Sequence, residues 1–408
     1  MNKPSVADAH KVRTTDGVGA LTDNSEDQRL DWSSVQGLRC VRQLRIMQLC
    51  VYLLASLFLF SLARADEPKL VIVDNDFTGP PDTLSDLRSA LMFLQNPNFK
   101  VLGFTVATGD GWRNEEVAHL LRLEEIVSRC DVPVIPGAVT PLVNTPQGKQ
   151  AWEKRYPEKK RKGFYWGAWD TKEDRPWEPE YTPHDPNVVP PIPEGLPCVL
   201  PCEELATEFM IRQVHAHPHE ISIFAGGPLT NIALAVRTDA EFTSLVKELV
   251  FLGAAIPPTD PDFNTRFDPE AARIVLGAHW PSITAICAIT YSIKLEKADI
   301  DKISAARTLA GDFVVRYSGL DVNKTNLWDE ICAAILIDPT LITHSDDAYV
   351  DIVLDHQQDY GAVRLDSNNA LIEGQSKLRV VNAIDVDRFK SLFIDSMIGK
   401  NANASSKQ

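Results

Sequence analysis

From residue 69 onward the chain alternates short apolar runs with segments in which apolar residues recur at helical spacing. The runs Lys69–Val73 and Val101–Val106 have the length of buried strands, and between them Leu87–Leu94 carries apolar residues at i, i+3, i+4 and i+7. Strands that alternate with helices pair in parallel, and the helices then cover the faces of the sheet. We therefore predict an α/β fold with an open, mostly parallel sheet flanked by helices, in a single domain over residues 66–400.

The alternation continues along the chain, and the tail from about residue 348 mixes strand-like and helical segments. The last residues, 401–408, are polar, and we expect a disordered tail there. The further elements that we expect are helices over 115–128, 203–216, 231–237 and 268–276 and strands over 132–135, 221–225, 248–252 and 283–288.

One segment, residues 144–201, interrupts the alternation, because it is rich in proline, tryptophan and charge and shows no period. We predict an irregular surface insertion there. Long loops inside compact domains are usually functional, so we also predict a mobile flap near the site. Its Trp166, Trp169 and Trp177 could stack on a base. A static insertion on the surface is the alternative.

The first 65 residues differ from the rest of the chain. Residues 1–46 are polar, Met47–Leu62 is an apolar run behind two arginines, and Ala63-Arg-Ala65 follows it. A basic flank, a short apolar run and a small-x-small site are typical of a signal peptide, and the run is short for a membrane span of about 20 residues. We predict that residues 1–65 are an N-terminal extension with a signal peptide, and that the protein is secreted or periplasmic without stable membrane contact. An uncleaved anchor is the alternative.

The chain is acidic, with a formal net charge of −15 over 408 residues. Acidic proteins repel phosphate backbones, so we expect no nucleic-acid partner. The charge is compatible with a small neutral substrate and with a hard cation.

Carboxylate, amide and glycine residues follow the expected strands. Because ligands of open parallel sheets bind at the carboxyl ends of the strands, we expect these residues to gather at one edge. Their oxygen atoms are the ligands that Ca²⁺ and Mg²⁺ prefer. The residues are Asp74, Asp76, Asp82 and Asp86 after the first strand, Gly109-Asp110-Gly111 after the second, Gly226–Asn231 after 221–225, and Asp260, Asp262 and Asn264 after 248–252.

Each of these residues taken alone has a simpler interpretation. A lone aspartate after a strand is more often a turn residue or a helix cap, and Gly-Gly-Pro is usually a turn. Asp268 followed by proline is a good start for a helix. Only the joint pattern favours a chemical site.

The joint pattern resembles the inosine–uridine-preferring nucleoside hydrolase family over nearly the whole chain beyond residue 65. In that family a first strand leads into an Asp-x-Asp motif and then into a pair of aspartates that begins a helix. The matching segments occur here in the same order as in the family. They are Val71–Asp76 with Asp86, Gly226–Ala233, Asp262–Ala272 and Trp328–Ala333.

This resemblance implies hydrolysis of the N-glycosidic bond of ribonucleosides to ribose and free base. It implies one Ca²⁺ ion, held by the carboxylates of Asp76, Asp86 and Asp329 and by the main-chain carbonyl of Gly226. Asp76 would also take the proton of calcium-bound water, as a base. A homo-oligomer is a further implication of the resemblance.

The resemblance also implies the contacts with the substrate. Asp110, Asp262 and Asn264 would hold ribose hydroxyls, and Phe263 would lie near the base or the ribose. We add Trp328 to the substrate-binding residues, since it stands where the family has a histidine.

Some positions depart from the pattern of the family. The linker before the aspartate pair is longer here, and the first aspartate of the pair is Ser85. Asp82, within that linker, could fold back to replace it, so we include Asp82 among the substrate-binding residues. Asp110 and Asp262 replace an asparagine and a glutamate. The metal ligands are therefore intact and the substrate contacts altered, which leaves the preferred base open.

Two alternatives are compatible with parts of the sequence. The run ending in Asp74-Asn-Asp76 also fits the first motif of haloacid-dehalogenase-like phosphatases, with Asp74 as nucleophile and Mg²⁺ bound, but no convincing later acidic pair follows. The long linker and Ser85 would suit a non-catalytic protein of the same fold that binds nucleosides or ribose without turnover.

The interpretation of the N-terminus has a direct test. The mature protein should begin at or near Asp66, because the small-x-small site ends at Ala65. N-terminal sequencing of the exported protein measures this. A mature chain that still carried residues before Met47 would contradict the prediction and favour the uncleaved anchor.

Overall fold

The structure is a computed structural model of the whole chain. The division of the chain into units falls between Ala65 and Asp66. The expected signal peptide, the expected tail at 401–408 and Trp177 lie outside the described residues, so these expectations stay predictions. The described residues are 67–161, 164–175, 183–256, 259–318, 322–366 and 368–400.

The described strands form one sheet of nine in the order β3-β2-β1-β4-β5-β6-β9-β7-β8. Strands β3 to β9 along this order are parallel, and β7 and β8 add an antiparallel edge. The predicted open, mostly parallel sheet is therefore confirmed. The strands are β1 Lys69–Asn75, β2 Phe99–Val106, β3 Val134–Pro136, β4 Ile221–Ala225, β5 Glu248–Leu252, β6 Ile283–Ile286, β7 Ile342–Ile352, β8 Val363–Asp366 and β9 Leu378–Ile384.

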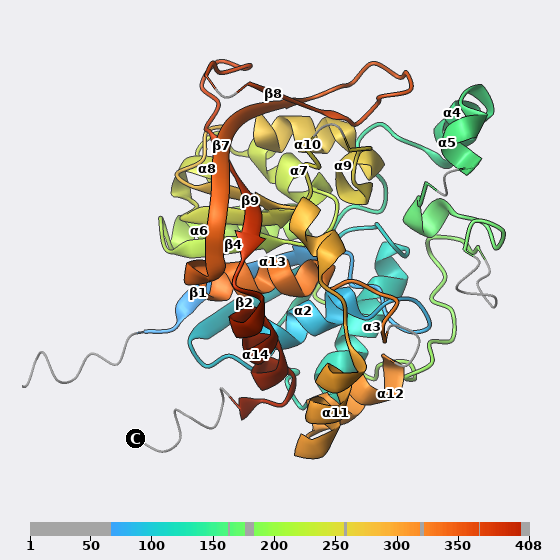
Figure 1. Ribbon diagram of the computed structural model, residues 1–408, viewed down its shortest axis with the longest axis vertical. Coiled ribbons are helices and arrows are strands. Elements are labelled where there is room, and N and C mark those ends of the chain that lie inside the picture. The colour runs from blue at the N-terminus through green and yellow to red at the C-terminus, as the bar shows by residue number, and fades with distance from the viewer. Residues whose placement is uncertain are drawn as a thin grey trace, which may run out of the picture. The chain divides into compact units, whose positions relative to one another are not determined.

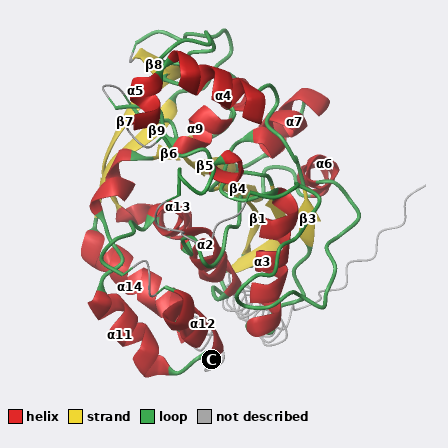
Figure 2. Cartoon of the chain, turned by 90° about the vertical axis from the view of Figure 1, so that its right-hand side faces the viewer, coloured by secondary structure: helices red, strands yellow, loops and turns green. Residues whose placement is uncertain are grey.

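Helices cover both faces of this sheet, and each face has its own apolar core (Figures 1 and 2). Side chains of β1 alternate between the two cores, with Val71 and Val73 in one and Ile72 in the other, as the period of a strand requires. One face carries α2 Ser85–Leu94, α3 Arg113–Ile126, α11 Lys297–Ala306, α12 Leu309–Tyr317, α13 Trp328–Ile337 and α14 Val386–Met397. The other carries α6 Ala206–Ala216, α7 Thr230–Thr238, α8 Phe242–Leu245 and α10 Pro269–Leu276.

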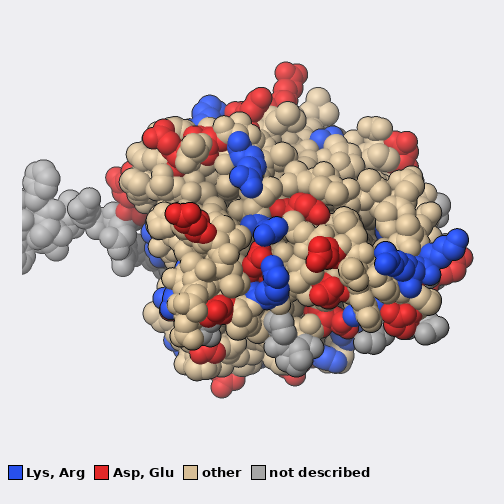
Figure 3. Space-filling model, turned by 90° about the horizontal axis from the view of Figure 1, so that it is seen from above, with Lys and Arg blue, Asp and Glu red and all other residues tan. Residues whose placement is uncertain are grey.

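The order of the strands determines where a ligand can bind. The chain runs outward from β1 through β2 and β3 on one side, and then crosses to β4, which lies against the other side of β1. The carboxyl ends of β1 and β4 therefore border a crevice at a topological switch point, where ligands of such sheets bind. Lys and Arg side chains are interspersed with Asp and Glu over the face drawn in Figure 3.

The insertion at 144–201 is more regular than its sequence predicts. It contains α4 Pro146–Arg155, α5 Pro157–Arg161 and a 3-10 turn at Gly167–Trp169, which the sequence does not predict, while its other described residues form no helix or strand, as expected of a mostly irregular segment. Thr145 caps α4, because its Oγ1 accepts a hydrogen bond from the backbone N–H of Gly148 at 3.0 Å. The polar sequence of α4 lacks the apolar stripe by which helices are recognised.

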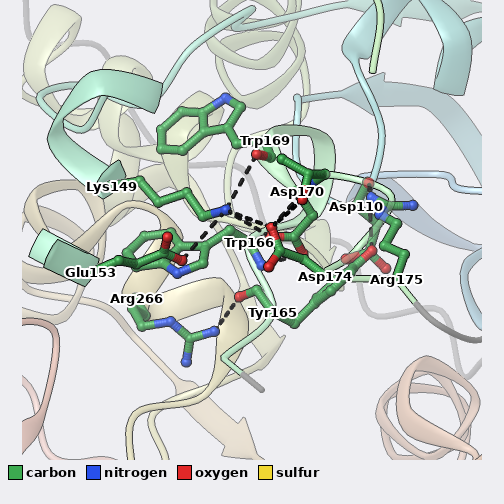
Figure 4. A network of polar contacts seen from close by, with 11 residues as sticks. Asp110, Lys149, Glu153, Tyr165, Trp166, Trp169, Asp170, Asp174, Arg175 and Arg266 are labelled. Atoms are coloured by element: carbon green, nitrogen blue, oxygen red, sulfur yellow. Dashed lines mark hydrogen bonds and ion pairs between the residues drawn. The ribbon is translucent and has the colours of Figure 1, made fainter. Parts of the chain in front are cut away.

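The insertion has an aromatic core of its own. Trp152, Trp166 and Trp169 pack there with Trp112 and Phe267 of the main body. The ammonium group of Lys149 is buried beside this core, 3.0 Å from Asp170, 3.4 Å from Asp174 and 3.5 Å from Glu153 (Figure 4). A buried cation among carboxylates stabilises one arrangement of the segment, because separating the charges would leave them unpaired in the interior.

Removal of this cation tests whether the insertion is rigid. In Lys149→Met the buried Asp170 loses the cation that lies 3.0 Å away. We expect the free energy of unfolding to fall by about 3–5 kcal/mol, and limited proteolysis between residues 164 and 175 to become faster. Lys297→Met is the matched control, because Lys297 and its partner Asp301 have side chains 73% and 60% exposed. It should cost less than about 1 kcal/mol. Equal effects of the two substitutions would contradict the prediction.

Candidate active site

Asp74 links the end of β1 to β2 and α7 through hydrogen bonds. Its Oδ1 accepts hydrogen bonds from the hydroxyl of Thr105 on β2 at 2.6 Å and from the amide of Asn231 on α7 at 2.8 Å. Burial raises the pKa of Asp74 to about 7, although both hydrogen bonds lower it. Asp74 therefore holds the strand end and the two loops beside it in place.

Asp76 lies two residues further, enclosed by glycines from two loops. Its Oδ2 accepts a hydrogen bond from the backbone N–H of Asp110 at 2.9 Å. A Cβ atom at Gly109 would lie 1.9 Å from Oδ2 of Asp76, and one at Gly227 would lie 2.4 Å from Oδ1. Only glycine allows the loops after β2 and β4 to approach this carboxylate so closely.

Asp329 and Asp86 come to the same place from the first turns of α13 and α2. The amide of Asn75 donates to Oδ1 of Asp329 at 3.3 Å. A Cβ atom at Gly226 would lie 2.3 Å from that same oxygen, so this glycine is also a point of close approach. The structure thus places the residues that the sequence predicts as metal ligands in the lining of one cavity.

These carboxylates are buried and act on one another. Burial raises the pKa of Asp76 and Asp86 most, and the neighbouring carboxylates raise them further. Burial, with Glu330 next in strength, raises the pKa of Asp329 to about 7. For Asp110, burial and Asp82 raise the pKa. Like charges that face each other in the interior favour protonation or a bound cation.

The cluster lies in a cavity of about 1260 Å³. All ten site residues predicted from the sequence line it, namely Asp76, Asp82, Asp86, Asp110, Gly226, Asp262, Phe263, Asn264, Trp328 and Asp329. Their roles stay predictions, but their grouping is a property of the structure. The sequence analysis missed lining residues that include Phe164, Tyr165, Arg266, Cys287 and Tyr291. The first two come from the insertion, and only Arg266 lies inside one of the matching segments, Asp262–Ala272, where the resemblance assigns it no role.

Three of the expected ribose or base contacts already have partners within the protein. Both oxygens of Asp262 accept backbone hydrogen bonds, from Thr265 at 2.9 Å and Ala255 at 3.0 Å, so this carboxylate caps α9, Phe263–Phe267. The amide of Asn264 donates to the carbonyls of Leu252 at 3.1 Å and of Gly226. The ring of Phe263 lies 5.0 Å from that of Tyr165. These bonds fix the loop after β5 against the strand ends.

The family model of the inosine-uridine preferring nucleoside hydrolases matches residues 71–391. The chain belongs to this family. Uridine nucleosidase 1 of Arabidopsis thaliana is 26% identical, over 78% of this chain and 89% of the relative. A pyrimidine-specific ribonucleoside hydrolase of Salmonella arizonae is 24% identical, over 63% of this chain and 74% of its own. The structure of a purine-preferring ribonucleoside hydrolase from Gardnerella vaginalis superposes with a TM-score of 0.64 at 19% identity, covering 82% of this chain and 100% of the other.

Membership makes the protein a nucleosidase, a hydrolase that acts on N-glycosyl bonds. The alternative of a haloacid-dehalogenase-like phosphatase is wrong, because the match extends over the segments that a phosphatase lacks. Among the residues that the structure describes, none of the helices is both long and apolar enough to span a membrane.

Ser85 replaces an aspartate of the nucleoside hydrolase pattern, and the structure gives a reason. Its hydroxyl donates to Oε2 of Glu330 at 2.7 Å and accepts from the backbone N–H of Asp329 at 3.2 Å. Glu330 also accepts from the guanidinium of Arg88 at 2.5 Å, and all of these side chains are buried. An aspartate at position 85 would place a second buried carboxylate against Glu330, whereas a hydroxyl can donate to it.

Asp82 lies in the nucleoside hydrolase cavity, but its carboxylate is directed to the insertion. Its Oδ2 lies 3.2 Å from the hydroxyl of Tyr165 and 3.2 Å from Nη1 of Arg175. Arg175 also donates to the main-chain carbonyl of Asp110 (Figure 4). The long linker that contains Asp82 is therefore bonded to the insertion at the cavity wall. The contact of Asp82 with substrate stays a prediction.

The close approach of Gly109 to Asp76 leads to a prediction. A methyl group at Gly109 would lie 1.9 Å from Asp76, so Gly109→Ala must displace the carboxylate or its loop. We expect kcat/KM for ribonucleosides to fall by about 10²-fold, because a displacement of about 1 Å can cost that much. Gly148→Ala on α4 is the control, since its nearest atom would be Thr145 Oγ1 at 3.2 Å. Its kcat/KM should stay close to the wild-type value. Unchanged kinetics in Gly109→Ala would refute the positional role of Asp76.

Proposed function

We propose that this nucleoside hydrolase cleaves ribonucleosides to ribose and free base with one Ca²⁺ ion at the carboxylate cluster. Asp76, Asp86 and Asp329 would hold the ion, with the main-chain carbonyl of Gly226 as a further ligand. The observation that carries the proposal is the convergence of these buried carboxylates at the ends of β1, α2 and α13. The uridine, pyrimidine and purine preferences in the names of its relatives support ribonucleosides as the substrate class and leave the base open.

The donor atoms suit this ion. Within the described part of the chain, no hydrogen bond reaches the carboxylate of Asp86, which is buried and surrounded by other acids. The buried Oδ1 of Asn75 also lacks a partner there. The carbonyl of Gly226 accepts one hydrogen bond from Asn264 and keeps a second lone pair. Carboxylate and carbonyl oxygens are the ligands that Ca²⁺ prefers, and a cation removes their mutual repulsion.

In the proposed reaction the groups of the cluster have different roles. Ca²⁺, when bound, supplies Lewis acidity that lowers the pKa of water and orients the ribose. Asp76 accepts a proton from the attacking water, as a base within hydrogen-bond reach. The surrounding carboxylates stabilise the positive charge that develops on the sugar ring in an oxocarbenium-like transition state.

Other residues would bind the substrate. Asp110, Asp262 and Asn264 hold ribose hydroxyls, which orients the sugar for attack. Phe263 and Trp328 offer flat apolar surfaces to the base. Both line the same cavity as the carboxylates.

Variants of the cluster test the proposal. Asp76→Asn keeps an amide oxygen that can coordinate, so it should retain measurable Ca²⁺ affinity and lose at least about 10²-fold in kcat, because an amide cannot accept the proton. Asp329→Ala removes a ligand and should weaken Ca²⁺ binding itself. Calorimetric titration of Ca²⁺ and hydrolysis rates for a ribonucleoside measure both effects.

The affinity of the cluster for Ca²⁺ should also depend on pH. A carboxyl whose folded-state pKa is raised stabilises the fold at low pH, and this stabilisation is lost as the pH rises through that value, which is about 7 for Asp329. Protons and Ca²⁺ compete for the cluster, so Ca²⁺ affinity should increase between about pH 5 and pH 8. A wild type that binds no divalent cation would defeat the proposal. A wild type that binds Ca²⁺ and ribose without hydrolysis would favour the non-catalytic alternative.

A further inference from the structure

Arg266 is a buried cation on the wall of the cavity. It lies on α9, three residues after Phe263, and is 5% exposed. Its Nη1 donates to the carbonyl of Pro261 at 2.9 Å and its Nη2 donates to the carbonyl of Tyr165 (Figure 4). The guanidinium lies 4.4 Å from the ring centroid of Phe164. Its position is therefore fixed by two main-chain oxygens and an aromatic face.

The charge of Arg266 has no direct counter-ion in the part of the chain that the structure describes. Within the described residues no carboxylate lies within ion-pair distance of the guanidinium, and its buried Nε has no hydrogen-bond partner. Burial lowers the pKa of Arg266 to about 10, so it stays protonated at neutral pH. A guanidinium in the cavity wall without a direct ion pair among the described residues can attract a negative charge that develops beside it.

The guanidinium of Arg266 is separate from the carboxylate cluster. The acids that act most strongly on Arg266 are Asp262, Asp170 and Asp260, with Tyr291 also nearby. None of the proposed metal ligands is among them. The cavity lining therefore presents a guanidinium beside aromatic rings, apart from the carboxylate cluster at the strand ends, and it also contains Asp260, Asp262 and Lys324.

Cleavage of an N-glycosidic bond also separates positive charge from negative charge. Positive charge develops on the ribose ring, and the departing base nitrogen becomes negative. At the position where the resemblance places a histidine, this chain has Trp328, which has no acidic proton to give to the base. No histidine is among the described residues that line the cavity. The leaving base therefore needs stabilisation from another group.

We propose that Arg266 stabilises the negative charge of the departing base in this enzyme. This role rests on the proposed function of the cavity. The C1′–N bond breaks with its electron pair passing to the base nitrogen, while the water oxygen bonds to C1′ and one water proton passes to Asp76. The base anion then takes a proton from solvent, Asp76 returns its proton to solvent, and Arg266 keeps its own. The sum is addition of one water molecule.

Arg266 also joins α9 to the insertion, so the experiment must separate charge from structure. The measurement that separates the two effects is the dependence of kcat/KM on the leaving group of the substrate. Ordinary bases are poor anions and need stabilisation, whereas p-nitrophenolate is a stable anion near neutral pH and needs little. Loss of the charge should therefore affect ribonucleosides selectively, and loss of local structure should affect both kinds of substrate.

The test compares Arg266→Gln and Arg266→Lys on inosine, uridine and p-nitrophenyl ribofuranoside. For Arg266→Gln we expect kcat/KM to fall by about 10²-fold on the better nucleoside and by less than about fivefold on the p-nitrophenyl substrate. Arg266→Lys keeps the charge but not the planar donor group that bonds two carbonyls and stacks on Phe164, so it should lose less nucleoside activity than Arg266→Gln without matching the wild type. Equal losses on both substrates, or the same selective loss in the lysine variant, would overturn the proposal.

Asn144→Ala is the matched control. The amide of Asn144 donates to the carbonyls of Arg266 at 3.2 Å and Phe267 at 3.0 Å, so the substitution loosens the same junction without changing its charge. It should alter both substrates equally, and a selective loss on nucleosides would count against the role of charge. A wild type that hydrolyses neither substrate would refute the proposed function itself, and is thereby distinguishable from failure of the Arg266 variants alone.

The wild-type protein gives a second measurement if Arg266→Gln does not fold. A leaving-group acid with the ordinary pKa of a histidine, about 6.5, would make nucleoside hydrolysis decline above pH 7. With Arg266 in this role, kcat/KM should stay level on the alkaline side until near the pKa of about 10. A decline for nucleosides near pH 7 that p-nitrophenyl ribofuranoside does not share would overturn the proposal.

Discussion

The burial of several carboxylates against one another at the switch point of the sheet is the constraint on which the rest of the site depends. Asp76, Asp86 and Asp329 reach this point from three elements, and each is less than 5% exposed. Holding like charges together in a medium of low polarity costs free energy unless protons or a cation compensate them. The glycines around Asp76 and the hydrogen bonds of Asp74 keep these groups together in spite of the repulsion.

Two other buried acids, Glu330 and Asp170, differ from the cluster because they have cationic partners. Glu330 has Arg88 and Ser85, and Asp170 has Lys149, so these charges are compensated inside the fold. Asp76, Asp86 and Asp329 have no ion pair among the described residues, so a bound cation would compensate charges that the fold leaves unpaired. The serine at position 85 fits this pattern, because it lets Glu330 be satisfied without adding another charge next to Asp86.

The sequence predicts the sheet and the positions of the site residues better than it predicts their surroundings. Strand periodicity and the rule that ligands bind at strand ends place Asp76, Asp110 and Gly226 correctly, because both depend on local pattern and on topology. The partners of Asp82 could not be predicted, since Arg175 is 93 residues away in an insertion without period. The helix α4 was missed for the same reason, because it is stabilised by the buried side chains of Trp152 and Lys149 and not by an apolar stripe.

The insertion supplies part of the cavity wall, through Phe164 and Tyr165. It is joined to the body through Asp82 by Arg175, through Arg266 by the carbonyl of Tyr165, and through Trp152, which donates to the carbonyl of Gln357 at 2.8 Å. A segment attached at these separate points orders the groups it carries before a substrate arrives. Electrostatic stabilisation is largest when dipoles and charges need no reorganisation during the reaction. A fixed wall that holds a guanidinium between two carbonyls meets that condition, whereas a mobile loop would have to order the same charge at each turnover.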